Sequence, residues 1–477
     1  MAPRHRLALL AVVAAGALPA PLLADDLREA LTLAYNTNPS LQAARANQRA
    51  VDEGVPIARA PGLPSIAGTA TYTEVLKSQS LIGPDRSLDL GANASVPIYS
   101  GGVVKNSLRA AQTRVLAGQA DLRAAESGIF SGVVAAYLDV ITNEAIVGLR
   151  RKNVEVLAVN VQSTRDRFEI GDLTRTDVAQ SQSRLAVARA GLETAEATLA
   201  ASRERYIQLV GKEPMNLQPP PPLTGLPANP EEATTVALDS NPDILAARQR
   251  SKAAGFDSNA AGAGRLPRIS VFSGVSRTDY LGTLGGGALS QNSTNATAGV
   301  RASIPIFSGG LPAAQQRQAR ARESATIENE IATEREVIAS VRSAYTQWQA
   351  ANAVILSSQT AVDAAALSLE GVRAENSVGN RTILDILNAE QELLNAQVQL
   401  VTARRNAYVA GFNLLSSMGK AEARDLGLDG GALYDPQVNY QRVRGKVFDW
   451  DLDPAPKPQG TRTVDTKVQD GSIPPAK

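Results

Sequence analysis

The chain has 477 residues, a formal net charge of +1, no cysteine and a single histidine, His5. We therefore expect neither disulfides nor a lipid-bearing N-terminal cysteine, and no Ser-His-Asp, Cys-His or ordinary zinc site. The balanced charge predicts no large surface for nucleic acid, and the 4% aromatic content favours long, closely packed helices over a broad globular core.

Residues 1–24 are typical of a secretory signal peptide, because Arg4 and Arg6 precede a short apolar segment from Leu7 to Leu18. The competing interpretation is a retained anchor, which this segment is too short to form comfortably. No later stretch offers the ~20 apolar residues of a membrane helix. The exported chain is expected to be soluble, peripheral or a β-barrel.

The exported part divides into two similar repeats, residues 25–218 and 229–424, with a proline-rich linker at 219–228. Each repeat opens with two short helical segments. The pair Asn38-Pro39 recurs as Asn241-Pro242, at a shift of 203 (241 − 38), and proline fits the first turn of a helix. The linker is expected to be stiff and extended.

Each repeat then has two predicted strands, at about 65–99 and about 268–307. Apolar and polar residues alternate from Ser87 to Ile98 and from Ala296 to Ile306, which predicts one apolar and one polar face. Both pairs close on Pro-Ile-aromatic-Ser-Gly-Gly, at 97–102 and 305–310.

A long helical hairpin follows each strand pair, at 102–212 and 310–419. The first helix of each is expected to run about 65 residues, roughly 100 Å of helix. The returning helices keep a seven-residue apolar repeat, which predicts left-handed coiled-coil packing. Its members are Val178, Leu185, Leu192, Leu199 and Tyr206, and then Leu387, Leu394, Val401, Tyr408 and Leu415. The polar segment 425–477 is expected to be mostly disordered.

The two hairpin tips, near 171–177 and 378–388, carry one motif. Gly171, Thr174 and Asp177 recur as Gly379, Thr382 and Asp385, at a shift of 208 (379 − 171). In each copy the glycine breaks the first helix, the threonine caps the next, and the aspartate lies in its first turn, where the helix dipole favours an anion.

The doubled layout, the junctions at 97–102 and 305–310 and the tip sequence from Val378 to Asp385 resemble the TolC family of outer-membrane efflux and secretion channels. The resemblance covers roughly residues 25–425. It implies an internally duplicated α+β membrane protein that forms a homotrimer. Long antiparallel coiled-coil hairpins would form a periplasmic α-barrel, and four strands from each chain would form a shared twelve-stranded outer-membrane β-barrel. The strand count agrees, since the smallest closed membrane barrels need about eight strands.

The resemblance implies a passive exit duct of a tripartite efflux pump or type I secretion system, gated at its periplasmic tip. The expected partners are outer-membrane lipid, a periplasmic adaptor and an inner-membrane transporter. The expected location is the outer membrane of a Gram-negative bacterium, with the helices in the periplasm. No catalysis and no cofactor are expected, and the cargo stays open between proteins and small molecules. Only Met215 and Met418 remain after processing, which argues against a methionine-lined copper route.

The resemblance also implies a closing lock in which Arg381 bonds the Thr176–Asp177 pair of the other hairpin. A partly buried Arg–Asp pair can stabilise one packing of helices and be broken to reach another. Asn376 stands where the family has a tyrosine that supports this lock. The competing interpretations are a solvated tip charge for Arg381 and simple first-turn residues for Asp177 and Asp385.

An aspartate ring at the entrance is the second feature that the resemblance implies. Asp385 matches its first member, and Asn388 replaces the second, so this ring would carry less negative charge. Three carboxylates around one axis would repel one another and attract cations weakly, without a dedicated metal site. Gly171 and Gly379 are expected to be structural in any interpretation.

Two other functions compete with the channel. A periplasmic adaptor also has a coiled-coil hairpin, but one hairpin with flanking β domains rather than a duplicated unit. A periplasmic hydrolase that uses carboxylates alone is the third candidate, and the heptads and missing histidines count against it.

Overall fold

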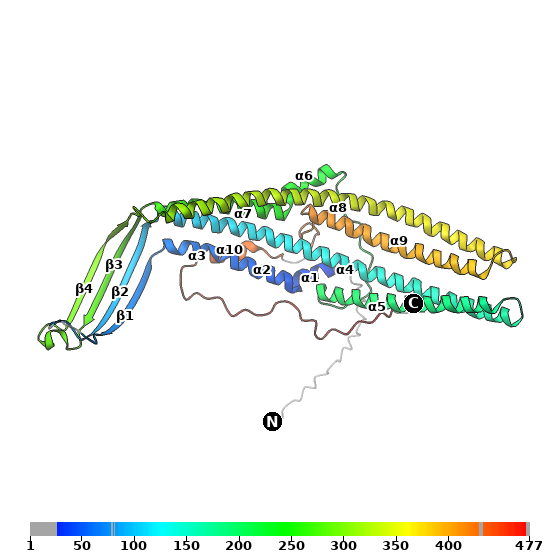
Figure 1. Cartoon of the computed structure of the whole chain (residues 1–477), viewed down its shortest axis with the longest axis horizontal. Helices are drawn as coiled ribbons and strands as arrows, with labels where there is room; N and C mark the ends of the chain where they lie inside the picture. Colours follow the sequence, from blue (N-terminus) through cyan, green and yellow to red (C-terminus); the bar gives the residue numbers. More distant parts are fainter. Residues whose placement is uncertain (1–25, 78–79, 81, 429–432, 474–477) are drawn as a thin grey trace, which may run out of the picture.

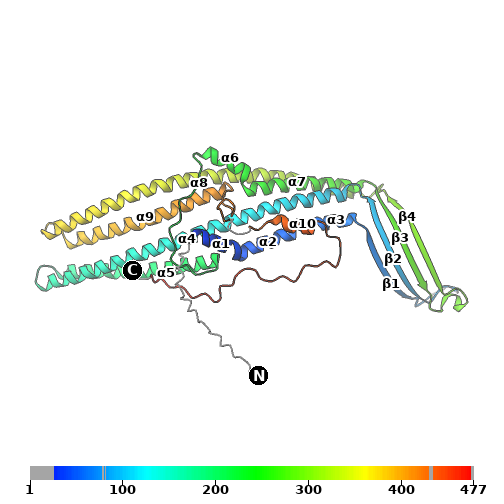
Figure 2. The same ribbon diagram turned by 180° about the vertical axis from the view of Figure 1, so that it is seen from behind.

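The computed structural model describes residues 26–77, 80, 82–428 and 433–473, so the predicted signal peptide at 1–24 lies outside the described residues. The molecule is elongated, with a four-stranded sheet at one end and the tips of two long helical hairpins at the other (Figure 1). Several short helices lie beside the middle of the helical body, as the opposite view also shows (Figure 2).

Each repeat combines short helices with one long hairpin. In the first repeat they are α1 (Leu27–Thr37), α2 (Pro39–Asp52), α3 (Gly54–Arg59), α4 (Val103–Glu169) and α5 (Arg175–Val210). In the second they are α6 (Pro230–Ser240), α7 (Pro242–Gly262), α8 (Leu311–Ser377) and α9 (Ile383–Ser417). The first helix of each hairpin has 67 residues, close to the length that the sequence predicts.

The Asn-Pro pairs join helices end to end. The Oδ1 of Asn38 accepts hydrogen bonds from the first turn of α2, while its Nδ2 donates to the carbonyl of Leu209 in the last turn of α5, 2.9 Å away. Asn241 caps α7 in the same way and donates to the carbonyl of Ser417, 2.8 Å away, at the end of α9. One asparagine in each repeat thus satisfies unpaired backbone groups of two helices.

The sheet joins the two repeats. Its strands are β1 (Ser65–Glu74), β2 (Arg86–Tyr99), β3 (Arg268–Asp279) and β4 (Asn292–Ser303), antiparallel in the order β1-β2-β3-β4. Each repeat supplies one β-hairpin, and the pairing of β2 with β3 makes the sheet continuous. The outer edges of β1 and β4 have no partner among the described strands.

The register gives the sheet one apolar face. Val96 pairs with Val271, which pairs with Val300, and Ile66 pairs with Ala94. Directly paired residues of antiparallel strands lie on the same face, and successive residues alternate between faces. Most apolar residues of the strands therefore gather on one side, as the alternation predicts, although Phe272 lies on the polar face beside Ser95, and Arg277 lies on the apolar face beside Leu90.

β4 lies earlier in the chain than predicted. The alternation predicts a strand from Ala296 to Ile306, whereas β4 spans Asn292–Ser303 and Ile306 is 96% exposed beyond its end. The reason is that Pro305 has no N–H to donate to a ladder, so pairing stops before it. The extra residues at the start of β4, Asn292 to Asn295, pair with the end of β3, from Asp279 to Ser276.

Glycines make the turn from strand to helix at both junctions. Gly102 and Gly310 immediately precede α4 and α8 with φ of 90° and 81°, in the left-handed region. Gly101 has φ of 67°, and a Cβ there would lie 2.9 Å from the carbonyl oxygen of Ala263. Residues with side chains resist this conformation, which explains the repeated Gly-Gly.

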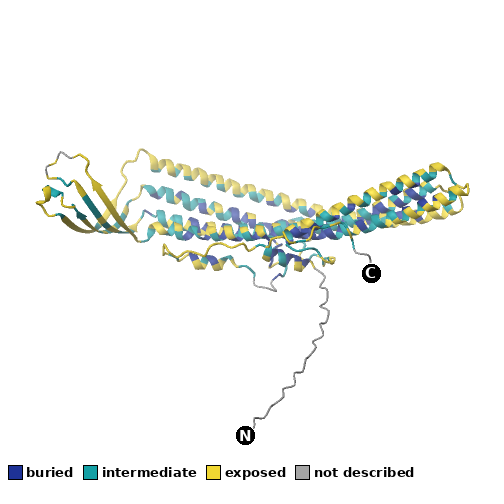
Figure 3. Cartoon of the chain, turned by 90° about the horizontal axis from the view of Figure 1, so that it is seen from below, coloured by how far each residue is buried: buried dark blue, intermediate teal, exposed yellow. Residues whose placement is uncertain are grey.

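The main core surrounds the middle of α4, where Figure 3 shows buried residues gathered in the helical body while the sheet stays largely exposed. Phe130, Val133, Val134 and Tyr137 of α4 are 0% exposed. By length and composition, α4 is also the one described helix that could cross a membrane. The prediction that no such stretch follows residue 24 is therefore wrong. The physical reason is that a helix in contact with several neighbours carries apolar residues around much of its surface.

Tyrosine hydroxyl groups hold the linker between the repeats and Gln218, the residue just before it. Tyr137 donates to the carbonyl of Gln218, Tyr408 to that of Pro221 and Tyr345 to that of Ala228, at 2.7, 3.1 and 2.9 Å. Burial raises the pKa of Tyr408 to about 12. An extended segment leaves its carbonyls free of internal partners, so the helices can bind it through these groups.

The C-terminal segment carries more structure than the mostly disordered tail that composition predicts after residue 425. It contains α10 (Pro436–Val443), and Asn439 of this helix donates to the fully buried Asp52 of α2 at 2.7 Å. Upstream of α10, the N–H of Tyr434 donates to the hydroxyl of Tyr35 at 2.8 Å. Its polar groups find partners on the first repeat, which composition alone cannot reveal.

Candidate functional site at the hairpin tips

Both hairpin tips are closed by a glycine and a capping box. Gly171 and Gly379 have φ of 82° and 81°. At the first tip the hydroxyl of Thr174 accepts a hydrogen bond from the N–H of Asp177 at 3.3 Å, and the carboxylate of Asp177 accepts one from the N–H of Thr174 at 2.9 Å. Thr382 and Asp385 repeat this geometry at the second tip. The predicted turn chemistry is thus what shapes both tips.

The capping boxes hold both aspartates in their ionised form. Hydrogen bonds from the side chain and backbone of Thr174 lower the pKa of Asp177, and those from the backbone and side chain of Thr382 lower that of Asp385. In the single chain both carboxylates therefore act as first-turn residues of their helices, as the competing interpretation holds. A ring of Asp385 carboxylates needs three chains and stays a prediction.

Arg381 pairs within its own hairpin in the single chain. Its Nε lies 2.7 Å from a carboxylate oxygen of Glu375 on α8, and this bond raises the pKa of Arg381. The Nδ2 of Asn376 donates to the Arg381 carbonyl at 2.6 Å. Arg381 is not brought together with Thr176 or Asp177 of the same chain, and Thr176 is exposed. A lock between neighbouring chains stays a prediction.

A buried carboxylate links the two hairpins, and sequence reasoning missed it. Glu390 of α9 is 6% exposed and accepts hydrogen bonds from Arg373 of α8 at 2.9 Å and from Asn160 of α4 at 3.0 Å. A buried charge needs such partners. The sequence does carry a signal, because Glu390 lies three residues after Leu387, at a core position of the heptad where an apolar residue is expected.

A second polar contact between the hairpins uses a predicted residue in an unpredicted way. Arg184 of α5 donates to the side-chain oxygen of Asn388 of α9 at 2.8 Å. The sequence predicts Asn388 only as a member of the entrance ring, yet in the single chain it bonds the other hairpin. A cavity of about 270 Å³ lies between α4, α8 and α9 at Glu390, lined also by Lys152 and Arg373. The contact between the hairpins therefore combines these polar links with an apolar cluster, in which Leu387 of α9 packs with Leu157, Val161 and Leu185 of the first hairpin.

The sequence profile described as outer membrane efflux protein matches residues 30–212 and 234–420, which together hold both hairpins and all four strands. The chain belongs to the outer membrane efflux protein family. The two matched segments correspond to the two repeats. This is a family of transport channels of the outer membrane, so the chain is an outer-membrane exit duct, and nothing in the comparisons supports a periplasmic adaptor.

Two curated relatives of this efflux family member span nearly its whole length. The outer membrane efflux protein BepC of Brucella suis biovar 1 (strain 1330) is 34% identical over 433 residues, 89% of this chain and 92% of BepC. The outer membrane protein TolC of Escherichia coli (strain K12) is 26% identical over 423 residues, 84% of each chain. The TolC resemblance that the sequence predicts is confirmed.

The fold of the family member matches that of solved channels. The crystal structure of the Campylobacter jejuni CmeC outer membrane channel superposes with a TM-score of 0.74 at 17% identity, over 88% of this chain and 89% of CmeC. At this identity the likeness concerns the fold. It confirms the predicted class, in which long helical hairpins continue from a four-stranded antiparallel sheet.

Proposed function

We propose that three copies of this chain form one duct, with a shared twelve-stranded β-barrel in the outer membrane and a helical tube in the periplasm. The observation that carries the proposal is the four-stranded sheet with unpaired outer edges on β1 and β4 among the described strands. Lipid offers no partner for an open edge, and closed membrane barrels need about eight strands or more. One chain cannot close such a barrel, whereas three identical chains can.

Exposed apolar side chains support both parts of this assembly. On the apolar face of the sheet Ile66 is 82% and Val300 68% exposed, which suits contact with lipid. On the helical body Ile327 and Ile331 of α8 are 44% and 43% exposed. A neighbouring chain placed against α8 would cover them.

Opening and closing would take place at the tips. We assign the closing contact to Arg381 of one chain and the Thr176–Asp177 pair of a neighbour, and a weak cation ring to the three copies of Asp385. In the single chain Arg381 is half exposed beside Glu375 and Asp177 is partly exposed, so both can change partners. The Glu390 link then holds the two hairpins of each chain in register while the contacts between chains change.

The partners we propose are a periplasmic adaptor and an inner-membrane transporter, which would supply the energy that a passive duct lacks. The cargo we propose is small molecules, because the relative that is 34% identical is named an efflux protein. Deleting the gene should raise sensitivity to dyes and detergents and leave the secreted proteins unchanged. Loss of a secreted protein with unaltered dye sensitivity would instead support a role in protein secretion.

The assembly itself is tested on the purified protein. In detergent we expect a trimer by light scattering, and in planar bilayers discrete conductance steps from the same fraction. A monomer that has no affinity for lipid would refute the proposal. A trimer without conductance would refute the open duct alone and leave the shared barrel standing.

A further inference from the structure

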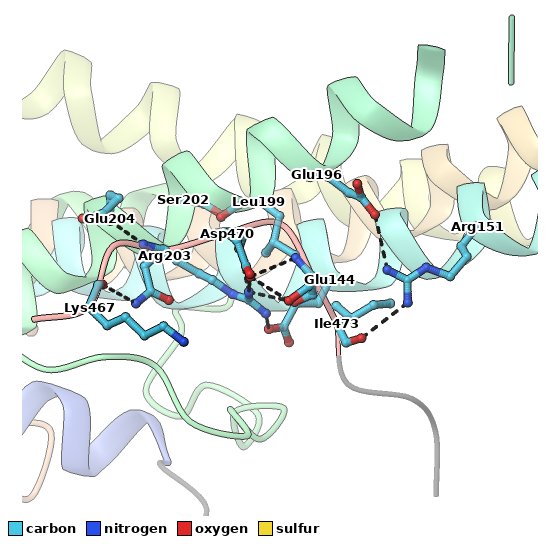
Figure 4. Close-up of polar contacts among 12 residues, drawn as sticks. Glu144, Arg151, Glu196, Leu199, Ser202, Arg203, Glu204, Lys467, Asp470 and Ile473 are labelled. Carbon is cyan, nitrogen blue, oxygen red and sulfur yellow. Dashed lines mark hydrogen bonds and ion pairs between the residues drawn. The ribbon is translucent and has the colours of Figure 1, made fainter. Parts of the chain in front are cut away.

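The outer surface of the first hairpin binds the end of the described chain. Figure 4 shows the C-terminal segment lying across α4 and α5, with Arg203 pointing toward Glu144 and Asp470. We propose that this surface, made by Glu144 and Arg151 of α4 and Glu196 and Arg203 of α5, is a receptor site for an extended peptide. Its ligand is residues 467–473 of the same chain.

Arg203 is the centre of the receptor site. It is only 9% exposed, pairs with Glu144 at 2.8 Å, and donates to the main-chain carbonyls of Asp470 and Ser472 at 2.8 and 2.9 Å. Arg151 donates to the carbonyl of Ile473 at 3.4 Å. A buried guanidinium needs acceptors for its N–H groups, and the peptide supplies two of them. Without the peptide these N–H groups would lose two acceptors and would have to bind water instead.

Glutamate side chains beside the receptor site also accept hydrogen bonds from the N–H groups of the ligand. The carboxylate of Glu213 accepts from the N–H of Lys467 at 2.7 Å, and that of Glu204 accepts from the N–H of Gln469 at 2.9 Å. Carboxylates therefore bind the amides of the segment and arginines bind its carbonyls. Recognition through main-chain groups is what an extended peptide of fixed direction requires.

The ligand's own sequence fits this surface. A Cβ at Gly471 would lie 2.3 Å from the carbonyl oxygen of Glu196, so only glycine can approach α5 this closely. Ile473 packs against the main core, with its Cδ1 beside Gly148 of α4. Asp470 accepts hydrogen bonds from the N–H and hydroxyl of Ser472, which fixes the turn between them. The ligand class is therefore an extended peptide with glycine, a small polar residue and an aliphatic residue in succession.

The proposal is tested in the full-length protein by hydrogen–deuterium exchange. The amides of Lys467 and Gln469 should be protected, and Gly471→Val should speed their exchange roughly tenfold or more by releasing the segment. The matched control is Val468→Ala, because Val468 is 84% exposed and its side chain takes no part in these bonds. Arg203→Ala should have the same effect as Gly471→Val, whereas Arg205→Ala, which removes only a contact with Gln208 on the same helix, should not.

A second measurement distinguishes a surface that binds the peptide as a separate molecule from one on which the chain's own segment is merely ordered. Gly471→Val leaves the receptor intact and vacant, so a fluorescein-labelled synthetic peptide of residues 461–473 should bind it and raise its anisotropy. The wild-type protein, whose site is occupied, and the Arg203→Ala/Gly471→Val double variant should not bind the peptide. Equal binding to all three proteins, or no binding to Gly471→Val after its own segment has been released, would overturn the proposal.

Discussion

The side-chain amide of Asn160 on α4 lies 3.0 Å from the carboxylate of Glu390 on α9, inside the contact between the two hairpins. Arg373 of α8 reaches the same carboxylate at 2.9 Å. Three of the four long helices therefore meet at one buried charge. Any movement of one hairpin against the other must break or carry along this link.

The first prediction concerns that link. Glu390→Ala leaves the half-buried amide of Asn160 without its acceptor, at a cost of about 1 kcal/mol. The exposed guanidinium of Arg373 can turn to water instead and adds little. We expect a lower thermal unfolding midpoint and a higher open probability in planar bilayers. The control is Glu392→Ala on the exposed side of the same helix. An unchanged open probability in Glu390→Ala would show that the link plays no part in closing the channel.

The second prediction concerns the tip. If Arg381 holds neighbouring chains together through Thr176 and Asp177, Arg381→Ser should increase single-channel conductance. Arg167→Ser is the matched control, because Arg167 forms a similar local pair with Asp172 at 2.6 Å near the other tip. Equal conductance in both variants and the wild type would favour a solvated tip charge for Arg381.

The third prediction follows from the first capping box. Thr174→Ala should lower stability by about 1 kcal/mol at neutral pH, the usual cost of losing an N-cap. Because hydrogen bonds lower the pKa of Asp177 from 3.8, its stabilisation is complete above that pH and is lost as the pH falls through the lowered value. The difference between wild type and Thr174→Ala should therefore shrink in acid. Thr198→Ala, in the middle of α5, should cause no such pH-dependent difference.

The fourth prediction concerns Glu126, whose contribution to stability should change with pH in the opposite direction to that of Asp177. Burial raises the pKa of Glu126 above 4.5, against the hydrogen bond that it accepts from the N–H of Ala423 at 2.6 Å. Its folded form holds a proton more tightly than the unfolded form, so its stabilisation is present at low pH and is lost as the pH rises through the raised pKa. Glu126→Gln keeps an acceptor without the charge, and its stability relative to wild type should increase over that range. The exposed Glu193→Gln should give a flat difference in the same thermal melts.

The fifth prediction compares two glycines. Gly102→Ala forces a side chain into the left-handed region at φ of 90°, so it should destabilise the protein by about 1–2 kcal/mol. Gly371 lies inside α8 with open space where the methyl group of an alanine would stand, and Gly371→Ala should stabilise by about 1 kcal/mol through higher helix propensity. Shifts of the unfolding midpoint in opposite directions are expected, and shifts of the same sign would contradict this account.

Most of the fold could be predicted because it follows from local patterns. The capping motifs at Thr174 and Thr382, the paired Gly-Gly junctions and the heptads each act over a few residues, so their spacing is visible without a structure. The Glu390 link and the Arg203 site depend instead on which surfaces meet across more than two hundred residues of chain. An acidic residue at a heptad core position was the one readable sign of the first, and the second left none beyond a short Gly-Ser-Ile sequence.

The asparagine joints at Asn38 and Asn241 have a consequence for length. Because α5 and α9 end there, while α4 and α8 continue past them, the portion between joint and tip is a two-armed module of its own. Adding seven residues to both arms of each hairpin should extend it by about 10 Å without changing which side chains face inward. Hairpins of different length could thus cross periplasmic spaces of different width while the sheet and the two asparagine joints stay unchanged.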